Sequence, residues 1–165
     1  ESLDLSWITI TGVDAETTIN RSALTRMFGQ GYPAFAAING GFLPIIGHLF
    51  NMDTSGSGTN RNGILAFINS RAIISSGGVK NAGYIGIFAS NSSIINTYNT
   101  NFSGAGVDGY RSVDNSTMNI SKGNAPECGD YGASVHNGSI IVLRNFTGTL
   151  SQTVNILTNN GIIFQ

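Results

Sequence analysis

The side chains best suited to chemistry are concentrated between residues 108 and 136. The 165-residue chain has only nine carboxylates and two histidines, and this short segment holds four of the carboxylates and one of the histidines. An arginine and two tyrosines accompany them. The candidate catalytic residues are Asp108, Arg111, Glu127, Asp130, Tyr131 and His136.

These residue types suit two kinds of acid–base chemistry. Asp108 with Glu127 or Asp130 would supply one carboxyl as the acid and another as the base, as hydrolysis requires. Alternatively, Tyr131 or His136 would remove a proton beside a carboxylate that Arg111 neutralises. The spacing alone does not choose between these chemistries.

Each of these residues also has a plainer interpretation. Asp108 and Asp130 adjoin glycines and are also typical of turns, and His136 is also typical of a surface. Arg111 is expected to point outward if Tyr110 points inward. His48 is expected to pack in the core, and Cys128 to be a small buried side chain at a turn.

The composition excludes several classes of function. Charged residues make up 10% of the chain, the net charge is -1, and no block of Lys or Arg is present, which argues against nucleic-acid binding. No run of 18 apolar residues exists, so we expect no membrane insertion. The two histidines stand 88 residues apart and the carboxylates lack Asp-x-Asp spacing, so we expect no metal and no cofactor.

A 23-residue repeat is the strongest pattern in the sequence. Glycine recurs at this interval in two series, and Asx and Ser residues follow at the same interval. The series are Gly63/Gly86/Gly109/Gly132, Gly83/Gly106/Gly129, Asn91/Asp114/Asn137 and Ser93/Ser116/Ser139. The first unit matches with one extra residue, placing Asn69 and Ser70 before Ile73-Ile74. We expect the glycines to occupy positions of positive φ, and the Asx residues, Asp114 included, to form a ladder of hydrogen-bonded side chains.

The repeat predicts an all-β protein, a right-handed parallel β-helix with coils of about 23 residues. A leucine-rich repeat is excluded because its leucine frame is absent, and a β-sandwich would not repeat residue identity at a fixed period. We expect one domain over residues 1–165. Residues 60–147 form the clear repeat, 1–59 form preceding coils and a Gly/Ser-rich loop at 54–62, and 148–165 form a terminal coil. The strand-like pattern that follows Glu1 suggests a piece of a longer chain.

Two stretches of sequence resemble the β-helix body of bacteriophage tailspike proteins, in the pectate-lyase-like β-helix superfamily. The first is Trp7-Ile8-Thr9-Ile10-x-x-Val13-Asp14-Ala15-Glu16 with Asn20-Arg21-Ser22-Ala23-Leu24-Thr25, and the second is Asn51-Met52-Asp53-x-x-Gly56-Ser57-Gly58-x-Asn60-Arg61-x-Gly63. The resemblance implies a homotrimer on the virion tail, outside the cell. Its partner would be a bacterial capsular or O-antigen polysaccharide, which it would bind and cleave by hydrolysis or β-elimination.

The resemblance also gives the aromatic residues a function. Tyr84, Phe88 and Tyr110 are candidates to bind the substrate by stacking on sugar rings. Two alternatives to a depolymerase stay open: a module that binds glycan without cleaving it, and a purely structural solenoid of a tail fibre or adhesin. The small number of carboxylates favours these alternatives.

Overall fold

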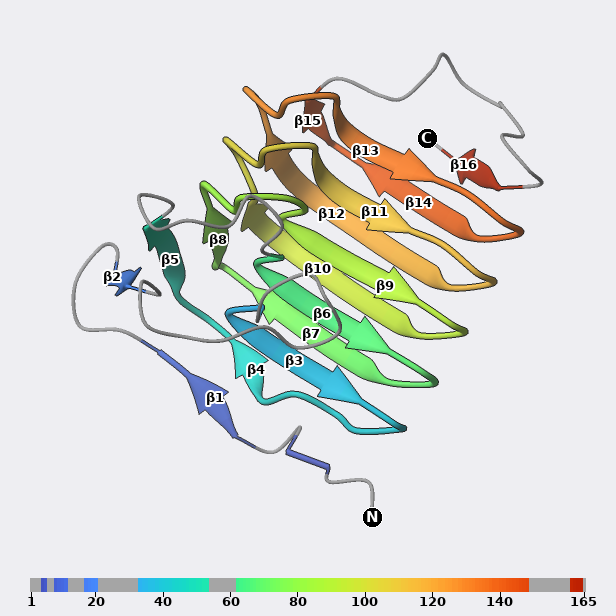
Figure 1. The fold of residues 1–165 in the computed structure, drawn as a ribbon, viewed down its shortest axis with the longest axis horizontal. Helices are drawn as coiled ribbons and strands as arrows, with labels where there is room; N and C mark the ends of the chain where they lie inside the picture. The colour runs from blue at the N-terminus through green and yellow to red at the C-terminus, as the bar shows by residue number, and fades with distance from the viewer. Residues whose placement is uncertain are drawn as a thin grey trace.

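The structure is a computed structural model that describes residues 4–5, 8–11, 17–20, 33–53, 62–148 and 161–164. The Gly/Ser-rich loop expected at 54–62 lies outside the described residues except for residue 62. Strands, turns and bends make up the described part, with no helix. The chain winds upward through successive coils from its N-terminal to its C-terminal end (Figure 1).

Two parallel sheets form the main walls of this β-solenoid. The front sheet, nearest the viewer in Figure 1, consists of β3 (Phe35–Ile38), β6 (Ile64–Phe67), β9 (Ile87–Ser90), β11 (Asp108–Ser112) and β13 (Tyr131–Val135). The back sheet consists of β1 (Thr9–Ile10), β4 (Ile45–Ile46), β7 (Arg71–Ser75), β10 (Ile94–Asn101), β12 (Thr117–Ala125), β14 (Ile140–Arg144) and β16 (Ile162–Phe164). Each of the five coils from β3 to β14 therefore contributes one strand to each sheet, and β1 and β16 extend the back sheet at its two ends.

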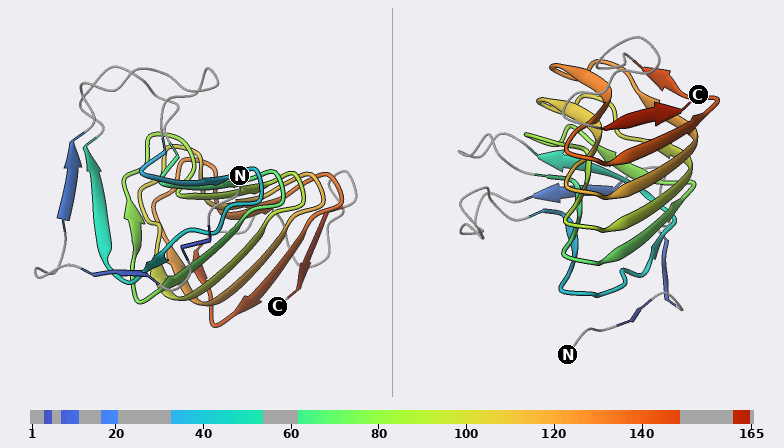
Figure 2. Two further views of the ribbon diagram at one scale, coloured as in Figure 1. Left: turned by 90° about the horizontal axis from the view of Figure 1, so that it is seen from below. Right: turned by 90° about the vertical axis from the view of Figure 1, so that its right-hand side faces the viewer.

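A shorter third wall completes the coils. It contains β2 (Thr17–Asn20), β5 (Leu49–Asp53), β8 (Gly78–Lys80) and β15 (Thr147–Gly148), which join the C-terminal parts of β10 and β12. The left view of Figure 2 shows β2 and β5 spread outward, whereas the right view shows the later coils stacked as regular rungs. The regular part of the solenoid is therefore the part in which the sequence repeats.

The strand register confirms the 23-residue period. In the front sheet Ile64 pairs with Ile87, which pairs with Tyr110. In the back sheet Arg71 pairs with Ile94, so the expected extra residue in the first unit is wrong. Positions that are 23 residues apart therefore lie directly above one another.

Three corners of each coil place residues in the left-handed region of positive φ. They recur in three columns: Asn39/Ile68/Asn91/Asp114/Asn137, Ser76/Asn99/Lys122/Asn145 and Asn81/Gly104/Glu127. Asn, Asp and Gly tolerate this conformation better than other residues, which explains why they dominate the columns. The corners, rather than the strands, account for much of the Asn content of the repeat.

A ladder of four buried serines follows the first corner. Ser70, Ser93, Ser116 and Ser139 have no exposed surface. The backbone N–H of each donates to the hydroxyl oxygen of the next, at 3.2, 3.1 and 3.0 Å. The hydroxyl of Ser93 in turn donates to the carbonyl of Ser90 at 2.8 Å. A buried donor left without its partner costs about 1 to 3 kcal/mol, so the ladder holds neighbouring coils in register.

The two glycine series have a different cause from the one that we expected. None of their members has positive φ. Instead, a Cβ at Gly86 would lie 2.5 Å from the carbonyl oxygen of Gly109, and one at Gly106 would lie 2.5 Å from that of Gly83. Glycine is required at these positions because the backbones of successive coils approach too closely for a side chain.

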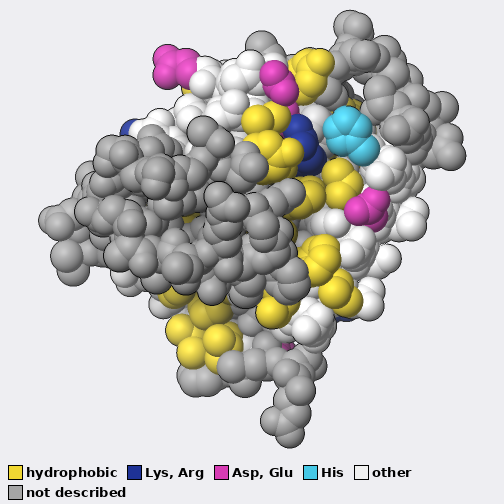
Figure 3. All heavy atoms as spheres, in the orientation of Figure 1, with side chains coloured by type: hydrophobic (Ala, Val, Ile, Leu, Met, Phe, Trp, Pro, Cys, Tyr) yellow, Lys and Arg dark blue, Asp and Glu magenta, His cyan; other side chains and the backbone are white. Residues whose placement is uncertain are grey.

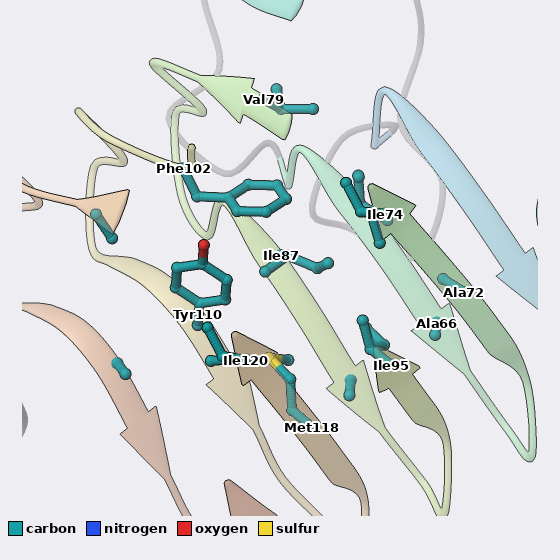
Figure 4. Close-up of a cluster of buried hydrophobic side chains, with 14 of the residues drawn as sticks. Ala66, Ala72, Ile74, Val79, Ile87, Ile95, Phe102, Tyr110, Met118 and Ile120 are labelled. Carbon is teal, nitrogen blue, oxygen red and sulfur yellow. The ribbon is translucent and has the colours of Figure 1, made fainter. Parts of the chain in front are cut away.

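Aliphatic columns and a few aromatic rings fill the interior. Tyr110 is completely buried and lies edge-on against Phe102 and Phe146, with ring centroids 5.0 and 5.6 Å away. Its hydroxyl lies 2.8 Å from the hydroxyl of Thr100, and Gly123 leaves the space that the phenol fills. Figure 4 shows Tyr110 and Phe102 together in this interior.

The first corner contains one residue that is poorly suited to its backbone. Ile68 has a φ of 57°, where the equivalent positions hold Asn or Asp. A β-branched residue in this region costs about 1 to 2 kcal/mol.

We predict that Ile68→Asn raises the free energy of unfolding by about 1 kcal/mol and Tm by about 2–4 °C, because Asn tolerates this φ. Little packing is lost, since Ile68 is not part of the main core cluster. Thermal denaturation tests this prediction. Asn91→Ile is the matched control and should lower Tm, and a lower Tm for Ile68→Asn would contradict the assignment.

Candidate functional site

An ion pair between Arg111 and Asp108 forms the centre of the candidate site. Arg111 points away from the interior that its neighbour Tyr110 fills, as expected. Its Nε and Nη2 each lie 2.5 Å from Oδ2 of Asp108. The Arg111 side chain is 18% exposed, whereas the Asp108 side chain has no exposed surface. The guanidinium is therefore partly exposed, whereas the carboxylate that holds it is fully buried.

Asp108 is enclosed by hydrogen-bond donors from the next coil. The hydroxyl of Ser134 donates to Oδ2, and the backbone N–H of Tyr131 donates to Oδ1 at 3.2 Å. Without accessible surface, the carboxylate has no direct contact with a substrate. The geometry thus gives Asp108 an anchoring role in place of the acid or base role that the sequence suggested.

Arg111 also contacts the coil below. Its Nη1 donates to the hydroxyl of Tyr84 at 3.4 Å, and the guanidinium carbon lies 5.6 Å from the centre of the Tyr84 ring. Its Nε lies 3.3 Å from the hydroxyl oxygen of Ser134 on the coil above. Three successive coils therefore fix the orientation of a single guanidinium.

His136 lies close enough to Arg111 and Asp108 for both charges to affect its pKa. Burial lowers the pKa of His136 below its ordinary value, the positive charge of Arg111 lowers it further, and Asp108 opposes the shift. At neutral pH the imidazole is therefore in the neutral form that accepts a proton. Figure 3 shows a cationic side chain and a histidine close together among hydrophobic side chains on the front of the molecule.

The remaining candidates divide into those at the site and those away from it. Tyr131 pairs in register with Asp108 and is 37% exposed. Glu127 and Asp130 are exposed, and the described part of the chain shows no hydrogen bond or ion pair from their side chains to Asp108, Arg111 or His136. Of the carboxyls that hydrolysis would pair, Asp108 is buried, whereas Glu127 and Asp130 are exposed.

Two of the three expected aromatic platforms stay near the surface. Tyr84 and Phe88 are half-buried on the front side, and Phe88 pairs in register with Arg111. Tyr110 lies in the core, so it has no accessible ring face on which a sugar could stack and is not a candidate for substrate binding. Its register neighbours, Ile87 and Ala133, are aliphatic, and this signal in the repeat would have placed it inside.

Sequence reasoning missed Ser134, which holds Asp108 and contacts Arg111. The 23-residue register places it beside Arg111, so the repeat contained the necessary signal. A second missed group, on the outer face of the back sheet, includes Asn96, Asn119 and Arg144. No motif marks that group in the sequence.

Several structural interpretations are confirmed. Asp114 belongs to a corner ladder, accepting from Asn137 Nδ2 at 2.8 Å and from the Ser90 hydroxyl at 3.1 Å. His48 is buried against the ring of Phe50. Cys128 is half-buried at a turn, and burial raises the pKa of its thiol.

The described residues contain no cluster of metal-ligating side chains and no membrane-spanning helix. No three or more His, Cys, Asp or Glu side chains gather there in a way that would hold a metal ion. None of the described segments is a helix with the length and apolar character needed to cross a bilayer.

Comparison of the chain with known protein families, curated proteins and solved structures found no match. What the structure itself shows is a parallel β-solenoid, a fold compatible with the β-helix superfamily.

The anchoring role of Asp108 can be tested by its effect on stability. Breaking a fully buried ion pair costs about 3 to 5 kcal/mol, and the partial exposure of Arg111 reduces this. We predict that Asp108→Asn lowers the free energy of unfolding in urea by about 2 kcal/mol, because the guanidinium loses its charged partner. The exposed Asp130→Asn is the control and should stay within about 0.5 kcal/mol of the parent. Equal effects of the two substitutions would contradict the anchoring role.

Proposed function

We propose that the front sheet binds a bacterial surface polysaccharide, capsular or O-antigen, and that the chain is the β-helix of a phage tailspike. One observation carries the proposal: Arg111 is held by three coils over the Tyr84 ring, with Tyr131 exposed on the coil above. We call Tyr84, Arg111, Tyr131 and His136 the front platform. The resemblance of residues 7–25 and 51–63 to tailspikes supports the phage assignment.

The chemistry of the front platform suits a sugar chain. The apolar C–H faces of sugars pack on aromatic rings, and their hydroxyls accept from guanidinium and exchange hydrogen bonds with imidazole. Because Arg111 is already fixed by its ion pair, binding costs little side-chain entropy. Tyr84 and Tyr131 belong to coils that are two steps apart, about 10 Å along the solenoid at about 4.8 Å a step. Such a separation favours an extended polymer over a single small ring.

Binding is proposed ahead of cleavage for a physical reason. Hydrolysis needs two accessible carboxyls flanking the bond, and Asp108, a member of each candidate pair, has no accessible surface. An enclosed carboxylate stabilises the platform rather than attacking a substrate. The front platform therefore supports recognition more strongly than hydrolysis.

β-Elimination is a second candidate, favoured by the lowered pKa of His136 beside Arg111. His136 would take the C5 proton of a uronate, and Arg111 would stabilise the charge that develops on the carboxylate. The C4–O glycosidic bond would then break as the C4=C5 double bond forms, and the departing oxygen would take a proton from water. The charge of Arg111 is already balanced by Asp108, which weakens this interpretation and places elimination second.

We extend the proposal to assembly and location. A homotrimer on the virion tail would present three front platforms to a repetitive polymer, which increases avidity. The target would then lie on the bacterial surface.

The test of binding uses the full 165-residue chain and a panel of purified capsular and O-antigen polysaccharides. We predict that Tyr131→Ala weakens the affinity for the recognised polysaccharide about five- to tenfold, the equivalent of about 1 kcal/mol of stacking. Biolayer interferometry measures the dissociation constants. Ile38→Ala removes a hydrophobic side chain of the same exposed fraction from β3, outside the front platform, and is the matched control, expected to leave the affinity unchanged.

The same incubations are read for new reducing ends and for the ultraviolet absorbance of unsaturated uronates. Absorbance that His136→Gln abolishes, while binding persists, would establish elimination. Reducing ends without absorbance would indicate hydrolysis. Absence of binding across the panel, or equal losses in Tyr131→Ala and Ile38→Ala, would overturn the proposed front platform.

A further inference from the structure

The outer face of the back sheet carries a shallow groove of about 350 Å³. Its lining includes Asn96 from β10, Asn119 and Ser121 from β12, and Val142 and Arg144 from β14. A volume of this size lies within the range of small-molecule sites, about 300 to 1,000 Å³. The groove is separate from the front platform, which lies on the other sheet.

Two side-chain amides run along the floor of the groove. Asn96 and Asn119 pair in register on neighbouring strands, and Nδ2 of Asn119 donates to Oδ1 of Asn96 at 2.8 Å. This bond fixes the amide orientations, leaving Oδ1 of Asn119 as an acceptor and Nδ2 of Asn96 as a donor. Both side chains are exposed, so these groups can bind hydroxyls of a ligand.

An exposed tyrosine continues the groove at one end. Tyr98 pairs in register with Ser121 and is 48% exposed. Nζ of Lys122 lies 3.2 Å from the Tyr98 hydroxyl and 5.3 Å from the ring centre. An aromatic face, an ammonium group and two amides therefore share one surface.

The charge of this surface distinguishes it from the front platform. Arg144 is exposed and pairs in register with Ser121. No carboxylate among the described residues forms an ion pair with Arg144 or Lys122. No Asp or Glu occurs in the strands around the groove, which are β7, β14, β16 and residues 94–98 and 117–121. Arg111, in contrast, is balanced by Asp108.

We propose that this groove is a second binding site, which takes an anionic sugar unit bearing a carboxylate or a sulfate. The amides of Asn96 and Asn119 bind the hydroxyls, Tyr98 and Val142 pack against the apolar face, and Arg144 with Lys122 bind the anionic group. Because neither cation pairs with a carboxylate among the described residues, an anionic ligand would not have to displace one. The inference is independent of the front platform and holds whether or not that platform binds a polysaccharide.

The experiment titrates the full chain with three oligosaccharides of equal length in low salt: a uronate oligomer, a sulfated oligomer and a neutral oligomer. Isothermal titration calorimetry gives the dissociation constants. We predict that at least one anionic oligomer binds tenfold or more tightly than the neutral one, and the preferred oligomer identifies the anionic group. Raising the salt concentration should weaken binding of the preferred oligomer.

Substitutions then locate the site. Arg144→Gln and Lys122→Asn should each weaken the preferred oligomer at least fivefold, and asparagine at 122 preserves the corner because Asn99 and Asn145 occupy equivalent positions. Arg71→Gln removes an exposed charge three strands away in the same sheet and should leave the affinity unchanged. Tyr131→Ala, the front-platform variant, is titrated beside them. Circular dichroism checks that each variant is folded.

Three results would overturn the second site. Equal affinity for neutral and anionic oligomers would remove the role of charge. An equal loss in Arg71→Gln and Arg144→Gln would indicate diffuse electrostatic attraction. Loss of anionic binding in Tyr131→Ala, with no effect of Arg144→Gln, would place the ligand on the front platform instead.

Discussion

Hydrogen bonds between equal positions of successive coils hold this molecule in register. The buried serine ladder is the clearest case, because the backbone N–H groups of Ser70, Ser93 and Ser116 each donate to the serine hydroxyl 23 residues further along the chain. A slip of one residue would leave these donors unsatisfied at about 1 to 3 kcal/mol each and turn core side chains toward solvent. The front platform depends on the same register, since Arg111 meets Ser134 above and Tyr84 below only when the coils are aligned.

The same stacking produces two outer faces with different electrostatics. On the front, the positive charge of Arg111 is balanced by a buried carboxylate, and what remains is an oriented donor among aromatic rings. On the back, Arg144 and Lys122 stand beside an amide pair without a described carboxylate partner. The front therefore suits a sugar chain recognised mainly by hydroxyls and ring faces, and the back suits an anionic group.

The repeat made the fold predictable, because residue identity at a fixed period reports stacking directly. Local matching was less secure: the Ile73-Ile74 pair resembles the Ile94-Ile95 pair, and only the serine column shows that Arg71 aligns with Ile94. The site was predictable as a neighbourhood but not as a set of roles. Whether Asp108 is open or enclosed depends on side chains from the coil above, and a single sequence does not fix how those side chains point.

The most direct test of the account removes one coil. Deleting residues 97–119 takes out 23 residues and joins Asn96 to Ile120, so that inward and outward positions are preserved on both sides of the junction. Deleting residues 97–118 takes out 22 and reverses the alternation in the middle of a strand. Circular dichroism during thermal denaturation should show a cooperative β-sheet transition for the first variant and none for the second. Equal stability of the two variants would contradict the central claim, that coils stack in a fixed 23-residue register.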